Sequence, residues 1–436
     1  MSTSQLIQQV RILDPVTERD QIADIWIVDG VIRAVDGQLS EAVGSDTDRI
    51  DGRGSILGPG LVDLYSHSGE PGFEERETLA SLQQAAWAGG FTRVAVLPDT
   101  VPVLDNPAGL SFVRRRVEEG KVEGNQPQLG FWGALTLGGK GEQMSELAEL
   151  AAAGIVGFAD DRPVEHLGLL RRILEYIGPL GKPVALWPCR RDLAGNGVAR
   201  EGSASVRLGL PGHPAIAETS ALSALLELVE AIATPVHIMR VSTARSVELI
   251  AHAKGRGVPV TASTSWMHLL LDTEALASYD PSLRLDPPLG NPGDRRALIQ
   301  GIDDGTIDAI AIDHRGYTYE EKTVAFSEAP AGAIGLELAL PLLWQEFVAT
   351  EKLSPLTLWK ALSLAPARCL QQEFRAIAPG EPAELTLFDP QTTWTADGRS
   401  LRSLSHNTPW LGQTITGRVA RSWLKKYDGH YIPYIK

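Results

Sequence analysis

The stretch Gly58-Pro-Gly-Leu-Val-Asp-Leu-Tyr-Ser-His67 joins a predicted buried strand to the remains of a metal-binding motif. Its apolar run, residues 61–64, is typical of a buried β-strand. Side chains alternate along a strand, so a His-x-His pair at its end would point both imidazoles to one side and chelate a divalent metal. Here Tyr65 stands at the first position and only His67 remains. Because a phenol has a pKa of about 10, Tyr65 is a poor ligand at neutral pH, and the motif predicts an incomplete metal site.

Downstream of this strand, the sequence alternates helical patterns with short apolar runs. This repeated unit predicts a parallel sheet, and the number of units suits a (β/α)8 barrel. The active site of such a barrel lies at the C-terminal ends of its strands. The predicted strands are 91–97, 154–158, 183–187, 235–239, 259–262 and 307–312, and the helices before them are 78–88, 144–153, 167–177, 221–233, 244–254 and 295–302.

The two ends of the chain carry a different pattern. Residues 6–57 form short alternating runs separated by turn residues such as Asp29-Gly30, and residues 383–389 and 417–423 repeat this pattern. Such runs are typical of small sheets. We therefore expect both termini to build one small β-sandwich domain. The predicted boundaries are 1–57 and 376–436 for its two parts, with the barrel over 58–375.

Composition excludes several classes of partner. The chain has 436 residues and a formal net charge of −14, which argues against nucleic acid or an anionic membrane as a partner. No apolar run approaches the roughly 18 residues that a membrane-spanning helix needs, and the start of the chain lacks the pattern of a signal peptide. Cys189 and Cys369 are isolated, so we expect no disulfide and a cytoplasmic protein.

Several motifs in a fixed order now point to a family. Taken together, they resemble the dihydroorotases of the amidohydrolase superfamily, and the resemblance covers nearly the whole chain. It implies a zinc-dependent (β/α)8 barrel that opens or closes the dihydroorotate ring. The motifs are Pro59-Gly-Leu-Val-Asp63, Glu70-Pro-Gly-Phe73, Ala88-Gly-Gly-Phe-Thr92, Asp160-Asp161, Leu208-Gly-Leu-Pro211, Val241-Ser-Thr243, Asp286-Pro-Pro288, Gly305-Thr-Ile-Asp308, Asp313-His314, Asn407-Thr-Pro409 and Gly417-Arg-Val419.

The resemblance also shows which metal ligands are missing. The family's paired histidines fall on Tyr65 and His67, and the two later histidines fall on Trp187 and Arg240. The bridging carboxylate falls on Asp160 or Asp161, and the final aspartate on Asp313. The set His67, Asp160 and Asp313 could just hold one zinc ion, because catalytic zinc needs three protein ligands and an open position. Arg240 argues against this, since a guanidinium cannot shed its proton. We expect Arg240 to pair with Asp313 or Asp160 and to replace the metal's charge.

Substrate-binding positions of the family are changed as well. The arginine that holds the substrate carboxylate is replaced by Gly69, and two asparagines are replaced by Asp99 and Asp286. A further family arginine falls on Gly290, and Arg315 follows the last aspartate in a new context. Dihydroorotate is an anion, so new carboxylates and lost arginines make the pocket electrostatically unfavourable for it.

Other polar residues have simpler interpretations. His237 precedes Arg240 by three residues on a predicted strand, so it points to the other side and is expected to be a core histidine. His268 is expected to be structural, and Cys189 lacks a nearby His or Asp partner for nucleophilic catalysis.

Three functional hypotheses follow from this mixture of kept framework and changed site. The first is a non-catalytic homologue that supports assembly of aspartate carbamoyltransferase in pyrimidine synthesis, as inactive members of the family do, in a homo- or hetero-oligomer. The second is a cyclic amidohydrolase with one metal on His67, Asp160 and Asp313, in which Asp313 moves the proton. The third, a true dihydroorotase with a displaced site, requires Trp187 and Arg240 to be tolerated where imidazoles bind.

Overall fold

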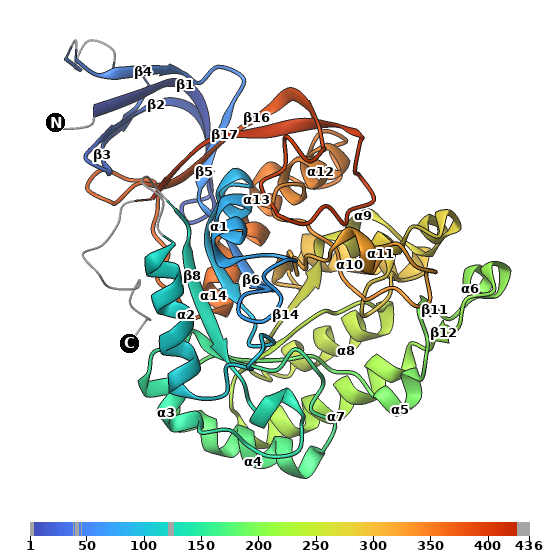
Figure 1. Cartoon of the computed structure of the whole chain (residues 1–436). Helices are drawn as coiled ribbons and strands as arrows, with labels where there is room; N and C mark the ends of the chain where they lie inside the picture. The colour runs from blue at the N-terminus through green and yellow to red at the C-terminus, as the bar shows by residue number, and fades with distance from the viewer. Residues whose placement is uncertain (1–3, 38, 40–42, 45, 121–125, 425–436) are drawn as a thin grey trace.

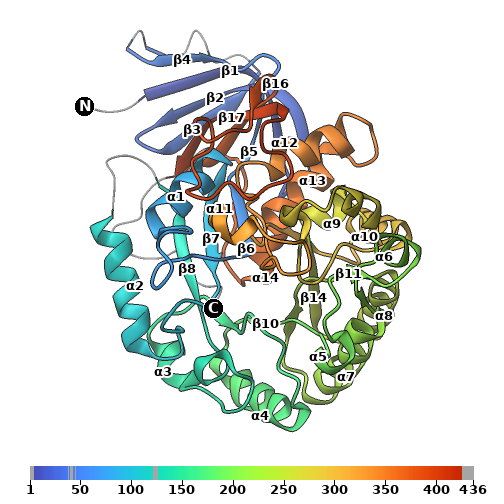
Figure 2. The ribbon, with the colours of Figure 1, turned by 45° about the vertical axis from the view of Figure 1, so that its right-hand side comes forward.

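Eight parallel strands form a nearly closed barrel at the centre of the molecule (Figures 1 and 2). The computed structural model describes residues 4–37, 39, 43–44, 46–120 and 126–424. Hydrogen bonds from Asp313 N to Tyr65 O (3.1 Å) and from His67 N to His314 O (2.8 Å) bring the last strand back to the first. The strands, in spatial order, are β6 (Leu61–Ser66), β7 (Phe91–Val96), β8 (Gln128–Gly133), β9 (Gly157–Ala159), β10 (Val184–Leu186), β13 (Val236–Ile238), β14 (Val260–Ser265) and β15 (Ala309–Ala311).

Amphipathic helices surround the barrel and cover its apolar outer face. In α4 (Leu167–Ile177), for example, Leu170, Ile173, Leu174 and Ile177 are buried at helical spacing. Side chains such as that of Asn106 cap helix starts by accepting backbone N–H groups. The other long helices are α1 (Leu79–Ala88), α2 (Pro107–Glu119), α7 (Ile216–Ile232), α8 (Ala244–Gly255), α10 (Pro292–Asp304) and α13 (Pro355–Leu362).

Both ends of the chain meet in one mixed sheet (Figure 1), which confirms that the two termini together build the small β-domain. Arg93 of β7 joins this sheet to the barrel through Glu384 of β16, with Nε 2.7 Å from Oε1. β5 extends to Pro59, past the predicted boundary at residue 57. The strand order is β17 (Thr414–Leu424), β16 (Glu384–Thr395), β5 (Ile56–Pro59), β1 (Ser4–Asp14), β2 (Arg19–Val28) and β3 (Val31–Asp36), and β4 (Asp48–Asp51) pairs with β1.

Shorter elements fill the loops around the barrel. A small two-stranded sheet of β11 (Ala199–Arg200) and β12 (Gly212–His213) carries α6 (Ser203–Leu208) away from the barrel (Figure 1). The remaining elements are η1 (Leu137–Gly139), α3 (Leu147–Ala152), η2 (Gly178–Leu180), α5 (Arg191–Ala194), α9 (Trp266–Leu270), η3 (Thr273–Ser278), η4 (Pro281–Leu283), α11 (Tyr319–Lys322), α12 (Ala339–Leu343), η5 (Trp344–Val348) and α14 (Leu364–Cys369).

The fold bears on two predictions from composition, one about the cysteines and one about membrane-spanning helices. Cys189 and Cys369 are both buried free thiols, and burial raises the pKa of each to about 12, so neither is an activated nucleophile. Within the described part of the chain, no helix combines the length and apolar character needed to cross a bilayer.

Candidate functional site

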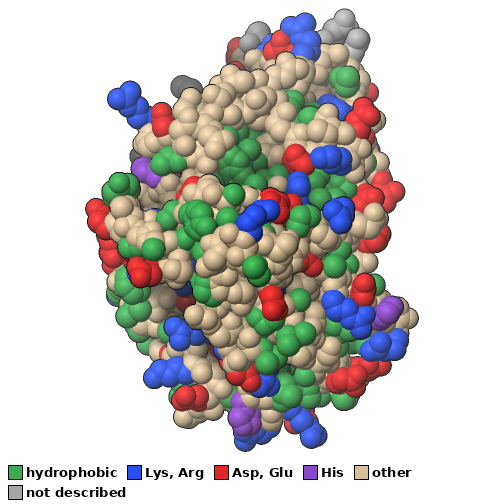
Figure 3. Space-filling view, turned by 90° about the vertical axis from the view of Figure 1, so that its right-hand side faces the viewer, with side chains coloured by type: hydrophobic (Ala, Val, Ile, Leu, Met, Phe, Trp, Pro, Cys, Tyr) green, Lys and Arg blue, Asp and Glu red, His purple; other side chains and the backbone are tan. Residues whose placement is uncertain are grey.

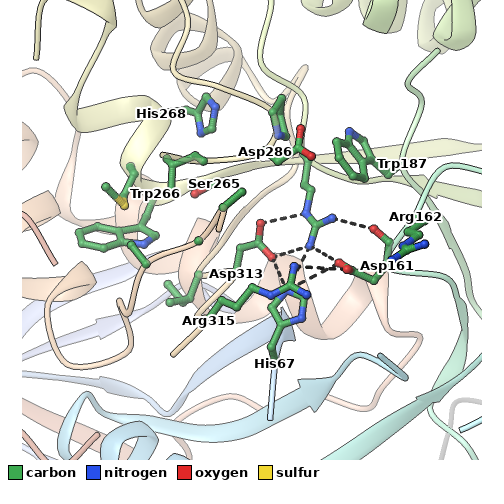
Figure 4. Close-up of a pocket in the computed structure, with 18 of the residues that line it drawn as sticks. His67, Asp161, Arg162, Trp187, Ser265, Trp266, His268, Asp286, Asp313 and Arg315 are labelled. Atoms are coloured by element: carbon green, nitrogen blue, oxygen red, sulfur yellow. Dashed lines mark hydrogen bonds and ion pairs between the residues drawn. The ribbon is translucent and has the colours of Figure 1, made fainter. Parts of the chain in front are cut away.

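The candidate site lies at the C-terminal ends of four barrel strands, where a (β/α)8 barrel carries its chemistry. His67 follows β6, Asp161 follows β9, Arg240 follows β13 and Asp313 follows β15. Figure 4 shows His67, Asp161 and Asp313 converging on one point. Side chains from strands far apart in the sequence therefore meet at the predicted place.

Arg240 is the centre of this group. Its guanidinium donates to Asp313 through Nε (2.9 Å to Oδ2) and Nη2 (2.8 Å to Oδ1). Nη2 also donates to Asp161 Oδ1 (2.9 Å), and Nη1 donates to the Asp161 carbonyl (3.1 Å). The Arg240 side chain is almost completely buried. This geometry agrees with the expected pairing to Asp313, but the second carboxylate is Asp161.

A second layer of charges surrounds the first. His67 Nδ1 lies 2.8 Å from Asp99 Oδ2, and its Nε2 lies 3.2 Å from Asp313 Oδ1. Arg315 bonds to Asp99 (2.8 Å) and to Asp161 (3.3 Å). Both hydrogens of Arg240 Nη2 have carboxylate acceptors, so His67 can donate from both ring nitrogens. We call His67, Asp99, Asp161, Arg240, Asp313 and Arg315 the charge cluster.

The positive and negative charges of the charge cluster neutralise one another. Burial alone would lower the pKa of His67, but Asp99 and other carboxylates raise it, which favours the imidazolium. Burial would likewise raise the pKa of Asp161 and of Asp313, but the guanidinium groups hold both well below the usual range. With His67 charged, three carboxylates face three cations, which is the condition under which buried charges are tolerated.

Two residues of the cluster have strained backbones. Arg240 has φ +55° and Asp313 has φ +52°, in the left-handed region that non-glycine residues rarely adopt. Such conformations persist where surrounding structure holds them in place, and they gather at functional sites. Here the Asp313 N–H donates to the Tyr65 carbonyl, and the Arg240 N–H donates to the Tyr65 hydroxyl (3.1 Å).

Tyr65 is therefore an integral support of the cluster. Its hydroxyl lies 2.9 Å from Ser263 Oγ, which in turn lies 2.8 Å from His237 Nε2. Burial raises the pKa of Tyr65 above the ordinary value of a tyrosine, so the phenol stays neutral. His237 also contacts Thr261 Oγ1 (2.9 Å), and burial lowers the pKa of His237 to about 3. The expectation that His237 is a satisfied core histidine is confirmed.

Trp187 occupies the position of another family histidine. Its ring is nearly buried and packs under two guanidinium groups, with the Cζ atoms of Arg240 and Arg191 at 4.8 Å and 4.6 Å from the ring centre. Cation–π contacts of this kind stabilise a desolvated charge. The indole therefore helps to hold Arg240 and offers no ligand atom to a metal, because its nitrogen is only a donor.

The sequence left open whether Asp160 or Asp161 faces the site, and the structure places Asp161 there, so the predicted ligand set that names Asp160 needs correction. Asp160 accepts hydrogen bonds from Leu135 N (2.8 Å) and from the Thr136 hydroxyl (2.6 Å), and burial raises its pKa to about 6. It fastens the loop after β8, whereas Asp161 lies in the cluster. β9 ends at Ala159, so strand alternation could not decide between these two neighbours.

At the positions where the family binds its substrate, the charged residues of this chain form ion pairs with one another. Asp286 pairs with Arg191 (2.8 Å), a partner that the sequence did not suggest. Asp99 and Arg315 belong to the charge cluster. A Cβ atom on Gly69 would lie 2.1 Å from the Phe73 carbonyl oxygen, so this loop has no room for an arginine at position 69.

Two cavities adjoin the cluster and share His67, Asp161, Arg162 and Arg315 in their walls. One, of about 210 Å³, is walled by Trp187, Trp266 and Asp286 among others (Figure 4). The other, of about 450 Å³, opens beside Lys140. His268 lines the first cavity with its Nδ1 buried and unpartnered, while its Nε2 lies 3.3 Å from the Pro288 carbonyl.

The residues present do not fit the zinc centre that the resemblance implies. Among the described residues, His67, Asp99 and Asp161 bring ligand atoms within 4.8 Å of one another. However, Arg240 and Arg315 already donate to the oxygens of Asp161, and Arg315 donates to Asp99. A divalent cation there would face two fixed positive charges at contact distance, which is strongly unfavourable in a buried site.

Comparison with known proteins places this geometry in a family. A model of the Dihydro-orotase-like family matches residues 54–246, and a model of the Amidohydrolase family matches residues 209–420. A "Probable dihydroorotase-like protein" of Synechocystis sp. is 44% identical over 94% of this chain and 97% of its own. A "Dihydroorotase" of Pelotomaculum thermopropionicum is 41% identical over 94% of this chain and 95% of its own.

Solved structures show the same fold at lower identity. An L-hydantoinase (dihydropyrimidinase) from Arthrobacter aurescens superimposes with a TM-score of 0.84 at 21% identity, over 98% of this chain and 96% of that one. This likeness concerns architecture alone. The near full-length sequence matches show that the chain belongs to the dihydroorotase-like family of amidohydrolases.

Proposed function

We propose that this protein is a dihydroorotase-like protein that does not hydrolyse cyclic amides and that supports aspartate carbamoyltransferase assembly in de novo pyrimidine synthesis. The observation that carries the first part is the position of Arg240, whose guanidinium contacts Asp161, Asp313 and His67. A side-chain cation stands among the groups that would otherwise hold a metal.

The state of Asp313 supports the same proposal. A general base needs a free lone pair directed at the proton it removes. Both oxygens of Asp313 accept from Arg240, and Oδ1 also lies 3.2 Å from His67. Because these cations hold the pKa of Asp313 well below its usual range, the carboxylate has little tendency to take a proton from water.

The partner part of the proposal rests on the resemblance. Barrel and terminal sheet are complete, while the polar groups at the barrel mouth bond to one another. A fold kept without its hydrolytic groups fits a protein whose role is to bind another chain. The buried free thiols Cys189 and Cys369 also fit our proposal that the protein resides in the cytoplasm.

A second candidate function is a mononuclear cyclic amidohydrolase, favoured by the grouping of His67, Asp99 and Asp161. Metal content separates the two candidates. We expect the protein, purified without chelator and then offered zinc, to hold less than about 0.1 equivalent, because a catalytic zinc needs three available ligands. About one equivalent, together with hydrolysis of dihydroorotate or another cyclic amide, would establish the second candidate.

Association is tested separately. Mixed at micromolar concentrations, the protein and aspartate carbamoyltransferase should elute together as one larger species in size-exclusion chromatography, since stable interfaces reach micromolar affinity or better. Separate elution under these conditions would contradict the partner part of the proposal. Running this protein alone would report its own oligomeric state.

A further inference from the structure

The cavity of about 450 Å³ beside the charge cluster has an unusual balance of charge. Four arginine or lysine side chains line it, Arg76, Lys140, Arg162 and Arg315, against three aspartates. This contrasts with the chain as a whole, whose formal net charge is −14. On the face shown in Figure 3, acidic and basic side chains are interspersed, so the cavity differs from that surface as well.

Most of these charges are already neutralised by neighbours. Arg315 pairs with Asp99 and Asp161 within the cluster, and Arg76 pairs with Glu321 (2.5 Å). Asp160 is held by Thr136, and burial raises its pKa to about 6. Lys140 and Arg162 are different, because within the described ranges neither side chain has an ion-pair partner. Two uncompensated cations therefore remain on this cavity.

Loop geometry brings these two cations to one rim. Lys140 follows the turn of Gly138 and Gly139, which have φ +62° and +63°, values that glycine adopts without strain. The Gly138 N–H donates to Asp105 and the Gly139 N–H to the Thr136 carbonyl, which fixes the turn. A Cβ atom on Gly141 would lie 3.7 Å from the Pro163 carbonyl oxygen, so this loop packs beside the segment that carries Arg162.

We propose that Lys140 and Arg162 form a binding site for a small organic dianion, with the adjoining cavity holding the rest of the ligand. Two cations on one rim suit a doubly charged oxyanion, either a phosphate monoester or a dicarboxylate, because arginine forks over paired oxygens and lysine adds a point charge. Gly69, the position of the family's clamp arginine, also lines this cavity but has no side chain, so the two cations come from Lys140 and Arg162 instead.

The size of the cavity favours a ligand larger than a bare ion. A volume of about 450 Å³ greatly exceeds the space of one oxyanion, and much of the remaining wall is uncharged, with Phe73, Val101 and Val103 among its residues. Enclosure of this kind is typical of small-molecule sites, which combine apolar walls with a few placed polar groups. An anion with a carbon skeleton would contact both the rim and the wall.

Binding is tested with inorganic phosphate, ribose 5-phosphate and succinate at low, matched ionic strength, since screening weakens exposed charge pairs. We expect one of the two organic dianions to bind at least about tenfold more tightly than inorganic phosphate, because it also contacts the wall. The preferred probe identifies phosphate monoester or dicarboxylate chemistry. Affinity is measured by equilibrium dialysis, with the shift of the thermal unfolding midpoint as a second readout.

Matched variants assign the binding to this rim. Lys140→Gln and Arg162→Gln should each weaken binding by about tenfold or more, the effect of losing one hydrogen bond to a charged group. Arg115→Gln removes an equal charge from an exposed position on α2 and should leave the affinity unchanged. All three positions are exposed, so we expect the variants to fold.

Three results would overturn the proposal. One is the absence of binding by all three probes at about 10 mM, beyond the range of a functional small-molecule site. The second is binding that the double variant K140Q/R162Q retains, which would mean a general effect of the anion on stability. If the double variant instead loses only its association with the transferase, the rim contacts a protein and the small-anion site is rejected. Because dialysis uses this chain alone, its outcome is independent of the proposed function.

Discussion

Arg240 places a tethered cation among carboxylates that would repel one another in its absence. Its contacts with Asp161 and Asp313 are short, and the side chain is almost fully excluded from solvent. A metal ion held by three protein ligands can dissociate or bind water at its fourth position, whereas a guanidinium can do neither. Arg240 therefore neutralises Asp161 and Asp313 with a cation that is covalently fixed to the chain.

Removal of this cation should be costly. We expect Arg240→Met to lower the free energy of unfolding by about 3–5 kcal/mol, because it leaves buried carboxylates uncompensated. Urea denaturation followed by far-UV circular dichroism measures the change. Arg191→Gln is the matched control, since its pair with Asp286 is partly exposed and should contribute less than about 1 kcal/mol.

The double variant R240M/D313N sharpens this test. Removing one uncompensated carboxylate should recover part of the stability that Arg240→Met loses, because the two sites are directly coupled. A loss in R240M no larger than that in R191Q would contradict the central role of the guanidinium. No recovery in the double variant would mean that the packing of the arginine, and not its charge, matters most.

Some side-chain contacts at the site were predictable from the sequence, and others were not. The pairing of Arg240 with Asp313 was predictable, because a fixed cation was expected beside an acidic ligand position. Arg191 and Ser263 were missed, since neither matches a catalytic motif, yet Arg191 neutralises Asp286 and Ser263 bonds to Tyr65. Ser263 directly follows the predicted strand 259–262, and β14 extends through it to Ser265, so only a polar residue next to a predicted strand end could have indicated it.

Among the elements, the short strand β9 (Gly157–Ala159) is closely packed inside the barrel. A Cβ atom on Gly157 would lie 2.5 Å from the Trp132 ring and 2.6 Å from the Pro183 carbonyl oxygen. Both neighbours belong to the interior, and one contact is with backbone that cannot rotate away. This strand leads directly to Asp160 and Asp161, so its position sets theirs.

We therefore expect Gly157→Ala to destabilise the protein by about 1–3 kcal/mol, the usual cost of overpacking a core. Differential scanning calorimetry should show a lower midpoint. In Gly255→Ala, the matched control on α8, the new methyl group meets no atom within 4 Å, and the helix gains a better former. Its midpoint should be unchanged or slightly raised, and equal midpoints for the two variants would refute the packing argument.

Element positions were the most predictable part of this protein. The predicted helix 167–177 coincides with α4, because its apolar positions recur at helical spacing over three turns. Strand ends were less predictable, since β10 ends at Leu186 and β15 at Ala311, before the predicted ends. The residues beyond these ends leave the strand to reach the site, and the left-handed conformation of Asp313 has no signal in local sequence.

For the whole molecule, buried acids make stability depend on pH. Burial raises the pKa of Asp63 to about 7, of Asp160 to about 6 and of Glu337 to about 7. A carboxyl whose pKa is higher in the folded state stabilises the fold fully below about pH 4, its unfolded pKa, and this stabilisation is lost as the pH rises through 6 to 7. Asp161 and Asp313 have lowered pKa values, so their contribution is lost as the pH falls below about 4.

Stability should thus be greatest near about pH 5 and should fall by up to about 1.4 kcal/mol per pH unit for each raised group towards pH 7. Urea denaturation at several pH values measures this slope. Glu337→Gln removes one titrating group and should flatten the decline, whereas Glu75→Gln, at an exposed position, should not. Stability that increases steadily from pH 5 to pH 8 would contradict this account.

For the fold, the barrel was predictable from the alternation of helices and strands and from the resemblance. The β-domain built by the two termini was predictable from their short alternating runs. Domain boundaries stay predictions, because the sheet that contains β5 passes directly into the barrel through Gly60 and β6. The cavity walls could not be predicted at all, since they depend on loops such as 137–141, whose path is set by left-handed glycines.

The bonding of Tyr65 to Arg240 has a consequence for how this lineage can evolve. Placing histidine at position 240 alone would remove the guanidinium from between two carboxylates, Asp161 and Asp313, while Tyr65 and Trp187 still offered no metal ligand. Restoring histidine at position 65 alone would take the acceptor from a strained backbone N–H and leave the guanidinium in place. Each of these single changes is expected to lower stability before any metal can bind, so a metal site at this barrel mouth requires several substitutions made together.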